Sequence, residues 1–268
     1  MMPQSGDIRV ESRDHDEPPL VSIIIPVRNE GPNLRISLRV LAALVEVPYE
    51  VLLVYDFPED SSVPVVDELK KDYPQFKLVL NVKGIGVSDA LFTGIDNAKS
   101  NYIAIMLADD IGPMTSLGDM IALMEDGCEF VSSTRYAHGG YRLGGSRLGY
   151  ILSITANKLF HWLAGCVLTD ATTGIKMFRR DIFKDFPFEA RPVGWAVVFE
   201  MAMKAQTMGL TLGEVPIISI DRLYGGKSTF KLFPWVLEYS RWFIWGLLNL
   251  RKNRDSQDRN VRIRIPER

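Results

Sequence analysis

Two adjacent carboxylates, Asp109 and Asp110, follow an apolar run from Ile103 to Leu107 and precede a Gly-Pro break. Adjacent like charges repel each other, so at the end of a buried strand they must be solvated, hydrogen-bonded or bound to a cation. A solvated turn is the default interpretation of an isolated Asp-Asp pair. The alternative chemistry is the binding of a divalent cation, because hard cations take oxygen ligands.

Two further polar clusters follow apolar runs nearer the N-terminus. Arg28, Asn29 and Glu30 follow LVSIIIPV, and Asp56 follows EVLLVY. Ligands of open α/β sheets bind at the carboxyl ends of the strands. If these strands are neighbours, all three clusters face one crevice, which favours a binding site over three unrelated turns.

The elements that must position these clusters alternate along the chain. Strands are expected at the two runs above and at residues 76–80 and 102–107, and helices near 33–44, 63–71 and 88–98. Buried strands that alternate with helices predict an α/β fold with a mainly parallel central sheet and helices on both faces.

Composition excludes several classes of protein. A hydrophobic fraction of 47% with 24% charged residues is typical of a folded protein. A net charge of -2 argues against a surface built for nucleic acid, so no nucleic-acid partner is expected. Cys128 and Cys166 match no metal spacing and are expected to be reduced, as in a cytoplasmic folding environment.

The chain divides into four predicted parts: a flexible N-terminal arm at 1–19 without a signal peptide, a globular domain at 20–230, an apolar aromatic helix at 231–250 and a basic tail at 251–268. The tail has seven Lys/Arg against three Asp/Glu. Apolar aromatics followed by bases are typical of a membrane-surface anchor, so we expect a peripheral protein on the cytoplasmic face of a membrane. The expected interface aromatics lie on one side of the helix and are Trp235, Tyr239, Trp242 and Trp245. The alternative is a helix that packs on the globular domain.

Several blocks together carry a family likeness. VSIIIPVRNEGPNLRISLRVL, VLLVYD, GIGVSDALFTGIDNAKSNYIAIMLADD and DATTGIKMFRR, in this order, resemble family 2 glycosyltransferases of the GT-A fold. FEMAMKAQTMGLTLGEVPIISIDRLYGGKSTFK looks most like the dolichyl-phosphate or polyprenyl-phosphate hexose synthases. The resemblance covers about residues 20–250. It implies an enzyme that moves a hexose, with inversion, from a nucleotide sugar of the GDP-mannose or UDP-glucose class to a polyprenyl phosphate.

On the donor side, the resemblance implies a nucleotide-binding set of Pro26, Arg28, Asn29, Glu30, Asp56, Gly84, Gly86 and Asp109. Asp109 aligns with the second acid of the family's Asp-x-Asp metal motif, whereas Leu107 replaces the first. Either Asp110 supplies the missing oxygen, or fewer protein ligands hold the cation, or metal dependence has weakened. Mg²⁺ or Mn²⁺ at Asp109 and Asp110 is expected, because a departing diphosphate needs its growing charge stabilised.

On the acceptor side, the resemblance implies a phosphate-binding set of Arg135, Arg147, Ser153, Arg222, Lys227 and Ser228. Glycines in DRLYGGKSTF let the backbone approach a phosphate, and an arginine fork suits its oxygens. A solvated helix arginine at Arg147 and a surface turn at Lys227 are the alternatives. The expected catalytic residues are Asp109, Asp110, Arg135, Arg222 and Lys227.

Two other functions stay open from the sequence. A family 2 transferase acting on a saccharide or protein would need a side-chain base, for which Asp110 and Asp170 are candidates. Leu107 and the FPEDSS stretch after the second strand are compatible with a non-catalytic nucleotide-sugar-binding protein. A homo-oligomer or a separate membrane-anchor subunit is also open.

Overall fold

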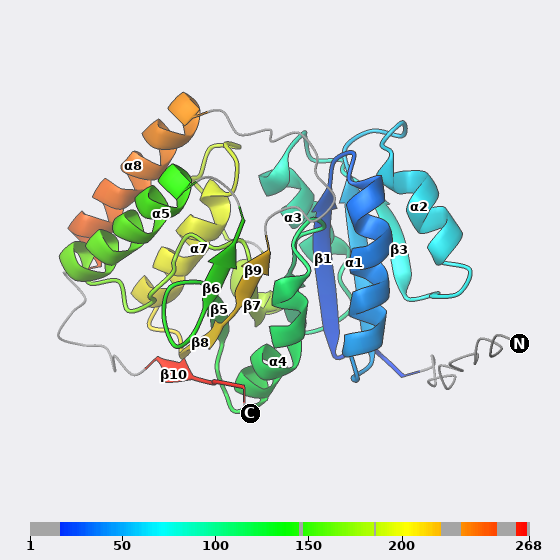
Figure 1. Cartoon of the computed structure of the whole chain (residues 1–268), viewed down its shortest axis with the longest axis horizontal. Coiled ribbons are helices and arrows are strands. Elements are labelled where there is room, and N and C mark those ends of the chain that lie inside the picture. The colour runs from blue at the N-terminus through cyan, green and yellow to red at the C-terminus, as the bar shows by residue number, and fades with distance from the viewer. Residues whose placement is uncertain (1–16, 145–146, 185, 221–231, 251–260, 267–268) are drawn as a thin grey trace, which may run out of the picture.

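A central sheet organises the protein in the computed structural model, which describes residues 17–144, 147–184, 186–220, 232–250 and 261–266, without the side chains of 147–149, 232 and 233 (Figure 1). Within these residues the sheet has eight strands, and neighbours are parallel except that β7 runs antiparallel to β4 and β5. The spatial order is β10 (Arg262–Ile263), β8 (Leu212–Pro216), β5 (Phe130–Thr134), β7 (Lys176–Arg179), β4 (Tyr102–Ile105), β1 (Val21–Val27), β2 (Tyr49–Tyr55) and β3 (Phe76–Leu80).

Helices cover both faces of the sheet and enclose two hydrophobic cores (Figure 1). One core is formed with α1 (Gly31–Leu44), α2 (Ser62–Leu69) and α4 (Leu117–Glu125). The other is formed with α3 (Val87–Asn97), α6 (Arg180–Phe183), α7 (Ala196–Thr207) and α8 (Leu232–Asn249). Strands between two cores are buried on both faces, which explains their continuous apolar runs. The predicted α/β class with a mainly parallel sheet is confirmed.

Further elements complete the described part of the fold. The helix α5 (Arg147–Leu159) continues into a π-helical turn, η2 (Phe160–Ala164), and the 3-10 turn η1 (Gly112–Ser116) precedes α4. A separate ribbon pairs β6 (Tyr141–Leu143) in parallel with β9 (Ile218–Ile220).

The C-terminal helix packs on the globular domain through its aromatic side. Trp242 is 1% exposed, and Tyr239 stacks on Phe199 of α7 with ring centroids 5.7 Å apart. Trp235 stacks in turn on Tyr239 at 5.2 Å, and the buried Glu238 accepts a hydrogen bond from the Trp242 indole at 3.1 Å. The expectation that the four aromatics face a membrane is therefore wrong. Tyr239, Trp242 and Trp245 pack instead in the core that includes α7, where burial of their large rings stabilises the fold.

Part of the predicted basic tail belongs to the sheet. Arg262 and Ile263 pair with Gly213 and Glu214 as the edge strand β10. The Arg264 guanidinium donates to Asp119 of α4 at 2.8 Å, so this arginine is used within the fold. The division of the chain at 251 therefore does not hold for residues 261–266.

Two ionisable groups are buried on β7 and β8, in the half of the sheet order that begins with β10. Lys176 is fully buried and donates to the Ser132 hydroxyl at 2.6 Å, and burial lowers its pKa to about 8. Glu214 accepts the Thr169 hydroxyl at 2.8 Å and the Asp170 amide at 3.3 Å. Burial raises the pKa of Glu214 to about 7, because an ionised carboxylate loses its hydration there.

We predict that Glu214 makes stability fall as pH rises. Its folded-state pKa of about 7 lies above its ordinary value of 4.5. Between these values the folded protein keeps a proton that the unfolded chain has released, so the free energy of unfolding decreases through this window, by roughly 2–3 kcal/mol. Glu214→Gln keeps most of the hydrogen bonds but does not titrate, so its decrease should be smaller. The other ionisable groups near it are Asp170, Lys176 and His138.

Denaturant titrations of both proteins at about pH 5 and about pH 7.5 measure this difference. Equal pH dependence in wild type and Glu214→Gln would show that Glu214 is ionised in the folded protein.

Candidate active site

The three predicted polar clusters meet at the carboxyl ends of the parallel strands, a boundary that we call the sheet edge. The strands β4, β1 and β2 are adjacent and parallel, so the residues that follow them lie at the same edge. Asp109 follows β4, Asn29 and its neighbours follow β1, and Asp56 follows β2. The convergence expected from the sequence is thus what the strand order produces.

Pro26 lies where β1 parts from β4. The pairing of these strands ends at Ile24 and Ile105, and in the last hydrogen bond between the two chains the Met106 N–H donates to the Ile24 carbonyl at 3.0 Å. Proline has no N–H to continue the ladder, whereas β1 keeps its register with β2 through Val27. The chain after β4 is therefore released from β1 just before Asp109.

The loop after β1 is tied to the loop after β2. Asn29 has a left-handed backbone with φ of 58°, and its N–H donates to both oxygens of Asp60 at 3.0 Å. In return, the Ser61 N–H donates to the Asn29 side-chain oxygen at 3.2 Å. Asp60 is 1% exposed and also accepts from the Ser62 N–H at 2.8 Å. These bonds fix the backbone beside Arg28 and Glu30.

Asp56 holds the glycine-bearing loop. Its two oxygens accept from the Asn81 side-chain amide at 2.8 Å and from the Gly86 N–H at 3.2 Å. Gly86 has a φ of 118°, which favours glycine, and it precedes α3 directly. Because Asn81 also accepts from Thr93 of α3 at 2.9 Å, one network joins β2, β3 and α3 beside Gly84 and Gly86.

The two adjacent carboxylates have different surroundings. Asp109 is half-buried. Asp110 is 7% exposed and accepts three hydrogen bonds, from the Ser219 hydroxyl at 2.6 Å, the Ile220 N–H at 2.8 Å and the Gly112 N–H at 3.3 Å. Burial raises the pKa of Asp110, and its hydrogen bonds work against this. Both oxygens of Asp110 are thus engaged with protein groups.

The Arg135 guanidinium forms a two-pronged ion pair with Asp170. Its Nε and Nη2 donate to the two carboxylate oxygens at 2.7 and 3.0 Å. Burial alone would raise the pKa of Asp170, but the charges of Arg135 and then Lys176 lower it. Asp170 is fully buried, whereas the Arg135 side chain keeps 16% of its surface exposed. An arginine held on one side in this way can present its remaining N–H groups to an anion.

Ser153 lies near this pair, on α5. The Tyr136 hydroxyl donates to the Ser153 hydroxyl at 2.7 Å, and the Arg135 guanidinium lies over the Tyr136 ring at 4.9 Å. Tyr136 therefore connects Arg135 to Ser153. Arg222, Lys227, Ser228 and the side chain of Arg147 lie outside the described residues.

Sequence reasoning missed four groups that build this edge, namely Asp60, Asn81, Lys176 and Glu214. Lys176 and Glu214 each stand among apolar residues, in GIKMF and GEVPI, and a charge inside a strand-like run is the signal that could have found them. Asp60 and Asn81 lie in loops. Their roles depend on contacts across the fold that no local pattern carries.

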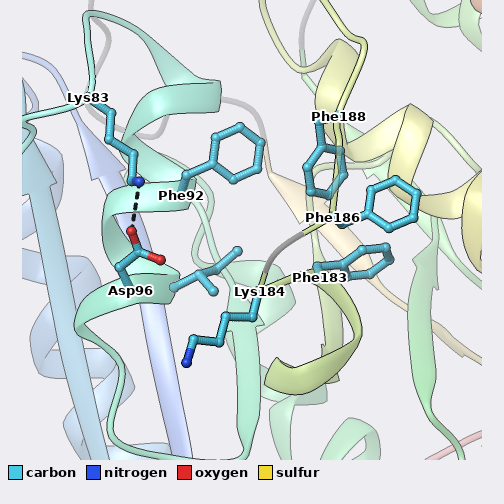
Figure 2. Close-up of a pocket in the computed structure, with 8 residues that line it drawn as sticks. Lys83, Phe92, Asp96, Phe183, Lys184, Phe186 and Phe188 are labelled. Atoms are coloured by element: carbon cyan, nitrogen blue, oxygen red, sulfur yellow. Dashed lines mark ion pairs between the residues drawn. The ribbon is translucent and has the colours of Figure 1, made fainter.

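A cavity of about 250 Å³ lies beside α3 (Figure 2). Its walls are aromatic rings with charged groups, and the Lys83–Asp96 ion pair of 2.8 Å spans one side. It is lined by Lys83, Phe92, Ile95, Asp96, Phe183, Lys184, Phe186 and Phe188. None of these residues is among the site residues predicted from the sequence.

The described residues contain no cluster of three or more His, Cys, Asp or Glu side chains arranged to hold a metal ion. Asp109 can still supply one carboxylate ligand. Mg²⁺ is commonly held by one or two carboxylates together with substrate phosphates, and this donor set fits a cation that arrives with a diphosphate.

Comparisons with known proteins agree with this architecture. A model of the glycosyl transferase family 2 matches residues 22–186. A dolichol-phosphate mannosyltransferase from Pyrococcus furiosus is 25% identical over 236 residues, which cover 83% of this chain and 64% of that protein. A polyprenol monophosphomannose synthase from Mycolicibacterium smegmatis is 27% identical over 209 residues, with 76% and 78% covered. The chain thus spans less than two thirds of the length of the first relative.

Solved structures share the fold at lower identity. Glucosyl-3-phosphoglycerate synthase from Mycobacterium tuberculosis, in complex with Mn²⁺, UDP and glucosyl-3-phosphoglycerate, matches with a TM-score of 0.62 and 15% identity. The match covers 87% of this chain and 80% of that chain. The family model spans more than half of the 268 residues. The protein therefore belongs to glycosyl transferase family 2, a family of sugar-transferring enzymes, as the sequence predicts.

Proposed function

We propose that the protein transfers a hexose from a nucleoside diphosphate sugar to a polyprenyl or dolichyl phosphate at the cytoplasmic surface of a membrane. The observation that carries this proposal is the division of one sheet edge into two chemically different halves. Polar loops with Asp56 and Asp109 occupy the half around β1, and Arg135 occupies the half around β5. The names of the two curated relatives support a lipid phosphate as acceptor.

In the donor half, the nucleotide would lie along the loops that follow β1, β2 and β3. The backbone groups near Arg28, Asn29 and Glu30 are already fixed by Asp60, and the Gly84–Gly86 loop is fixed by Asp56. Nucleotide binding would therefore need little further ordering of these loops, and the small entropy cost favours affinity. The choice between a guanine and a uracil base rests on a few hydrogen bonds, so both donors belong in the test.

A divalent cation, Mg²⁺ or Mn²⁺, would stabilise the charge on the departing diphosphate. Asp109 is the ligand that we assign to it. The three hydrogen bonds on Asp110 favour the alternative in which fewer protein ligands hold the cation. The solved structure with Mn²⁺ and UDP supports cation use in a protein of this fold.

In the acceptor half, a phosphate oxygen would attack the anomeric carbon while the bond to the diphosphate breaks on the opposite face, which inverts the configuration. The nucleoside diphosphate leaves with the electron pair. A lipid phosphate is already ionised at neutral pH, so no side-chain base is needed. Arg135 would hold this phosphate together with Arg147, Ser153, Arg222, Lys227 and Ser228.

An exposed aliphatic surface supports attachment to a membrane surface. On the helices α5, η2 and α8, the large hydrophobic side chains that are more than 40% exposed are Ile151, Leu152, Leu159, Trp162, Val236, Leu237, Ile244 and Leu248. We call these eight residues the apolar face. Helices in the described part of the chain are too short or too polar to cross a bilayer. An amphipathic helix that lies in the interface needs only such a face.

Replacing Asp109 tests the donor half. Asp109→Ala should lower transfer by on the order of 10²-fold or more, because it removes a contact to the charge that develops on the diphosphate. The thermal midpoint should stay close to that of wild type. Initial rates with GDP-mannose and UDP-glucose, each at several Mn²⁺ concentrations, measure the effect. Asp72→Ala, an exposed acid elsewhere, is the matched control, and wild-type activity in Asp109→Ala would reject the assignment.

Replacing Arg135 tests the acceptor half. Arg135→Ala should raise the KM for polyprenyl phosphate or lower kcat by roughly tenfold or more, because one charge-assisted hydrogen bond is worth about 1.5–3 kcal/mol. Nucleotide affinity should stay nearly constant. The single variant leaves the buried Asp170 unpaired, which costs about 3–5 kcal/mol of stability. The double variant Arg135→Ala/Asp170→Asn removes that charge and should recover stability without recovering the acceptor KM.

If calorimetry showed that these variants lose nucleotide binding while the acceptor KM stays fixed, Arg135 would belong to the donor half.

The apolar face should carry membrane attachment. Leu237→Gln/Ile244→Gln/Leu248→Gln should reduce binding to anionic vesicles by at least about tenfold, because burial of each such side chain contributes on the order of 1 kcal/mol or more. Vesicle co-sedimentation measures the partitioning. Leu44→Gln/Met208→Gln removes exposed apolar groups at the C-terminal ends of α1 and α7 and is the control. Unchanged binding of the triple variant would reject the apolar face as the attachment surface.

A further inference from the structure

Asp110 joins two parts of the edge that are distant in sequence. Its carboxylate sits in the turn after β4, and it accepts the Ile220 N–H and the Ser219 hydroxyl at the end of β9. The side chains of Asp110 and Ser219 are 7% and 8% exposed, so these bonds are shielded from water. Hydrogen bonds to a shielded carboxylate are stronger than bonds between neutral groups.

The backbone around Asp110 is also packed closely on β9. Gly112 donates its N–H to the same oxygen that accepts the Ile220 N–H. A side-chain carbon at Gly112 would overlap the Ile218 carbonyl oxygen, so only glycine allows this approach. The turn and the strand therefore form one closely fitted contact, with the carboxylate at its centre.

The strand β9 belongs to the acceptor half of the edge. It pairs with β6, so Arg142 lies opposite Ser219. The Ile217 N–H donates to the Thr134 carbonyl at 2.9 Å, one residue before Arg135, and the Tyr141 N–H donates to the Ile217 carbonyl at 2.9 Å. The chain that leaves β9 leads to residues 221–231, which carry the acceptor residues predicted from the sequence.

We propose that Asp110 is a positioning residue that fixes β9, and with it the acceptor-binding part of the edge, against the turn that carries the donor-side Asp109. This inference rests on the proposed function, because it takes the two substrates from there. Asp110 touches neither substrate in this account. Its carboxylate sets the distance between the two phosphate-binding halves, and sugar transfer depends on that distance because the reacting atoms must be held in line.

An asparagine substitution distinguishes a positioning role of Asp110 from a role as a metal ligand. An asparagine at this position keeps an oxygen for the two N–H groups, and its amide can donate to Ser219, whose hydroxyl can turn to accept. A metal site, in contrast, loses a charged ligand in the same substitution. Asp110→Asn should therefore rescue most of what Asp110→Ala loses.

The test compares Asp110→Ala, Asp110→Asn and Ser219→Ala with wild type by two independent measurements. Hydrogen exchange of the peptide that contains Ile220 needs no substrate. We expect faster exchange in Asp110→Ala and Ser219→Ala, and slow exchange restored in Asp110→Asn. Transfer assays should show kcat/KM for polyprenyl phosphate reduced by about tenfold or more in Asp110→Ala, less in Ser219→Ala, and largely recovered in Asp110→Asn. Mn²⁺-dependent binding of GDP and UDP should change by no more than about twofold.

Two results would overturn the inference. Loss of Mn²⁺-dependent nucleotide binding in Asp110→Asn would make Asp110 a metal ligand, and unchanged exchange at Ile220 in both Asp110→Ala and Ser219→Ala would show that Asp110 does not hold β9. Should Asp110→Ala fail to fold, Ser219→Ala and Asp110→Asn still decide between these outcomes. Absence of lipid-dependent transfer in wild type would reject the proposed function alone, because the exchange measurement stands without it.

Discussion

The parallel alignment of β4, β1 and β2 is the constraint on which the candidate site depends. Parallel neighbours end at the same edge, so loops separated by tens of residues in the sequence meet there. Pro26 sharpens this arrangement, because β1 can continue beside β2 but not beside β4. The strand order thus brings the loops after β4, β1 and β2 together, and Pro26 lies where the chain after β4 separates from β1.

Carboxylates that accept backbone N–H groups then hold the loops in place. Asp60 accepts from Asn29, Asp56 accepts from Gly86, and Asp110 accepts from Ile220. The first two bonds each join two loops, and the third joins the turn after β4 to β9. A hydrogen bond to a carboxylate contributes about 1.5–3 kcal/mol. In the proposed acceptor half, Asp170 accepts a hydrogen bond from the Arg135 guanidinium and holds this side chain in place. Loops held in advance need little reorganisation when charge develops in a reaction, which is how preorganised sites stabilise transition states.

Apolar patterns made the fold predictable, and contacts across the fold made parts of the site unpredictable. The run FKLVL predicted β3, which spans Phe76–Leu80, and alternation with helices predicted the parallel sheet. The apolar pattern predicts helix α8, and the structure shows that its aromatic side faces α7. This contact could not be predicted, because periodicity identifies an apolar side but not the element that covers it. For Asp110, the acidic pair marked the position. Its partner Ser219 is 109 residues away, so the sequence could not distinguish a metal ligand from a hydrogen-bonded carboxylate.

In the proposed function, one sheet edge holds a donor half and an acceptor half. A crystal structure with a nucleoside diphosphate, Mn²⁺ and a short-chain polyprenyl phosphate tests it most directly. The account predicts the diphosphate and cation beside Asp109 and the lipid phosphate on the exposed side of Arg135. A diphosphate bound at Arg135, or a lipid phosphate bound away from both residues, would contradict it.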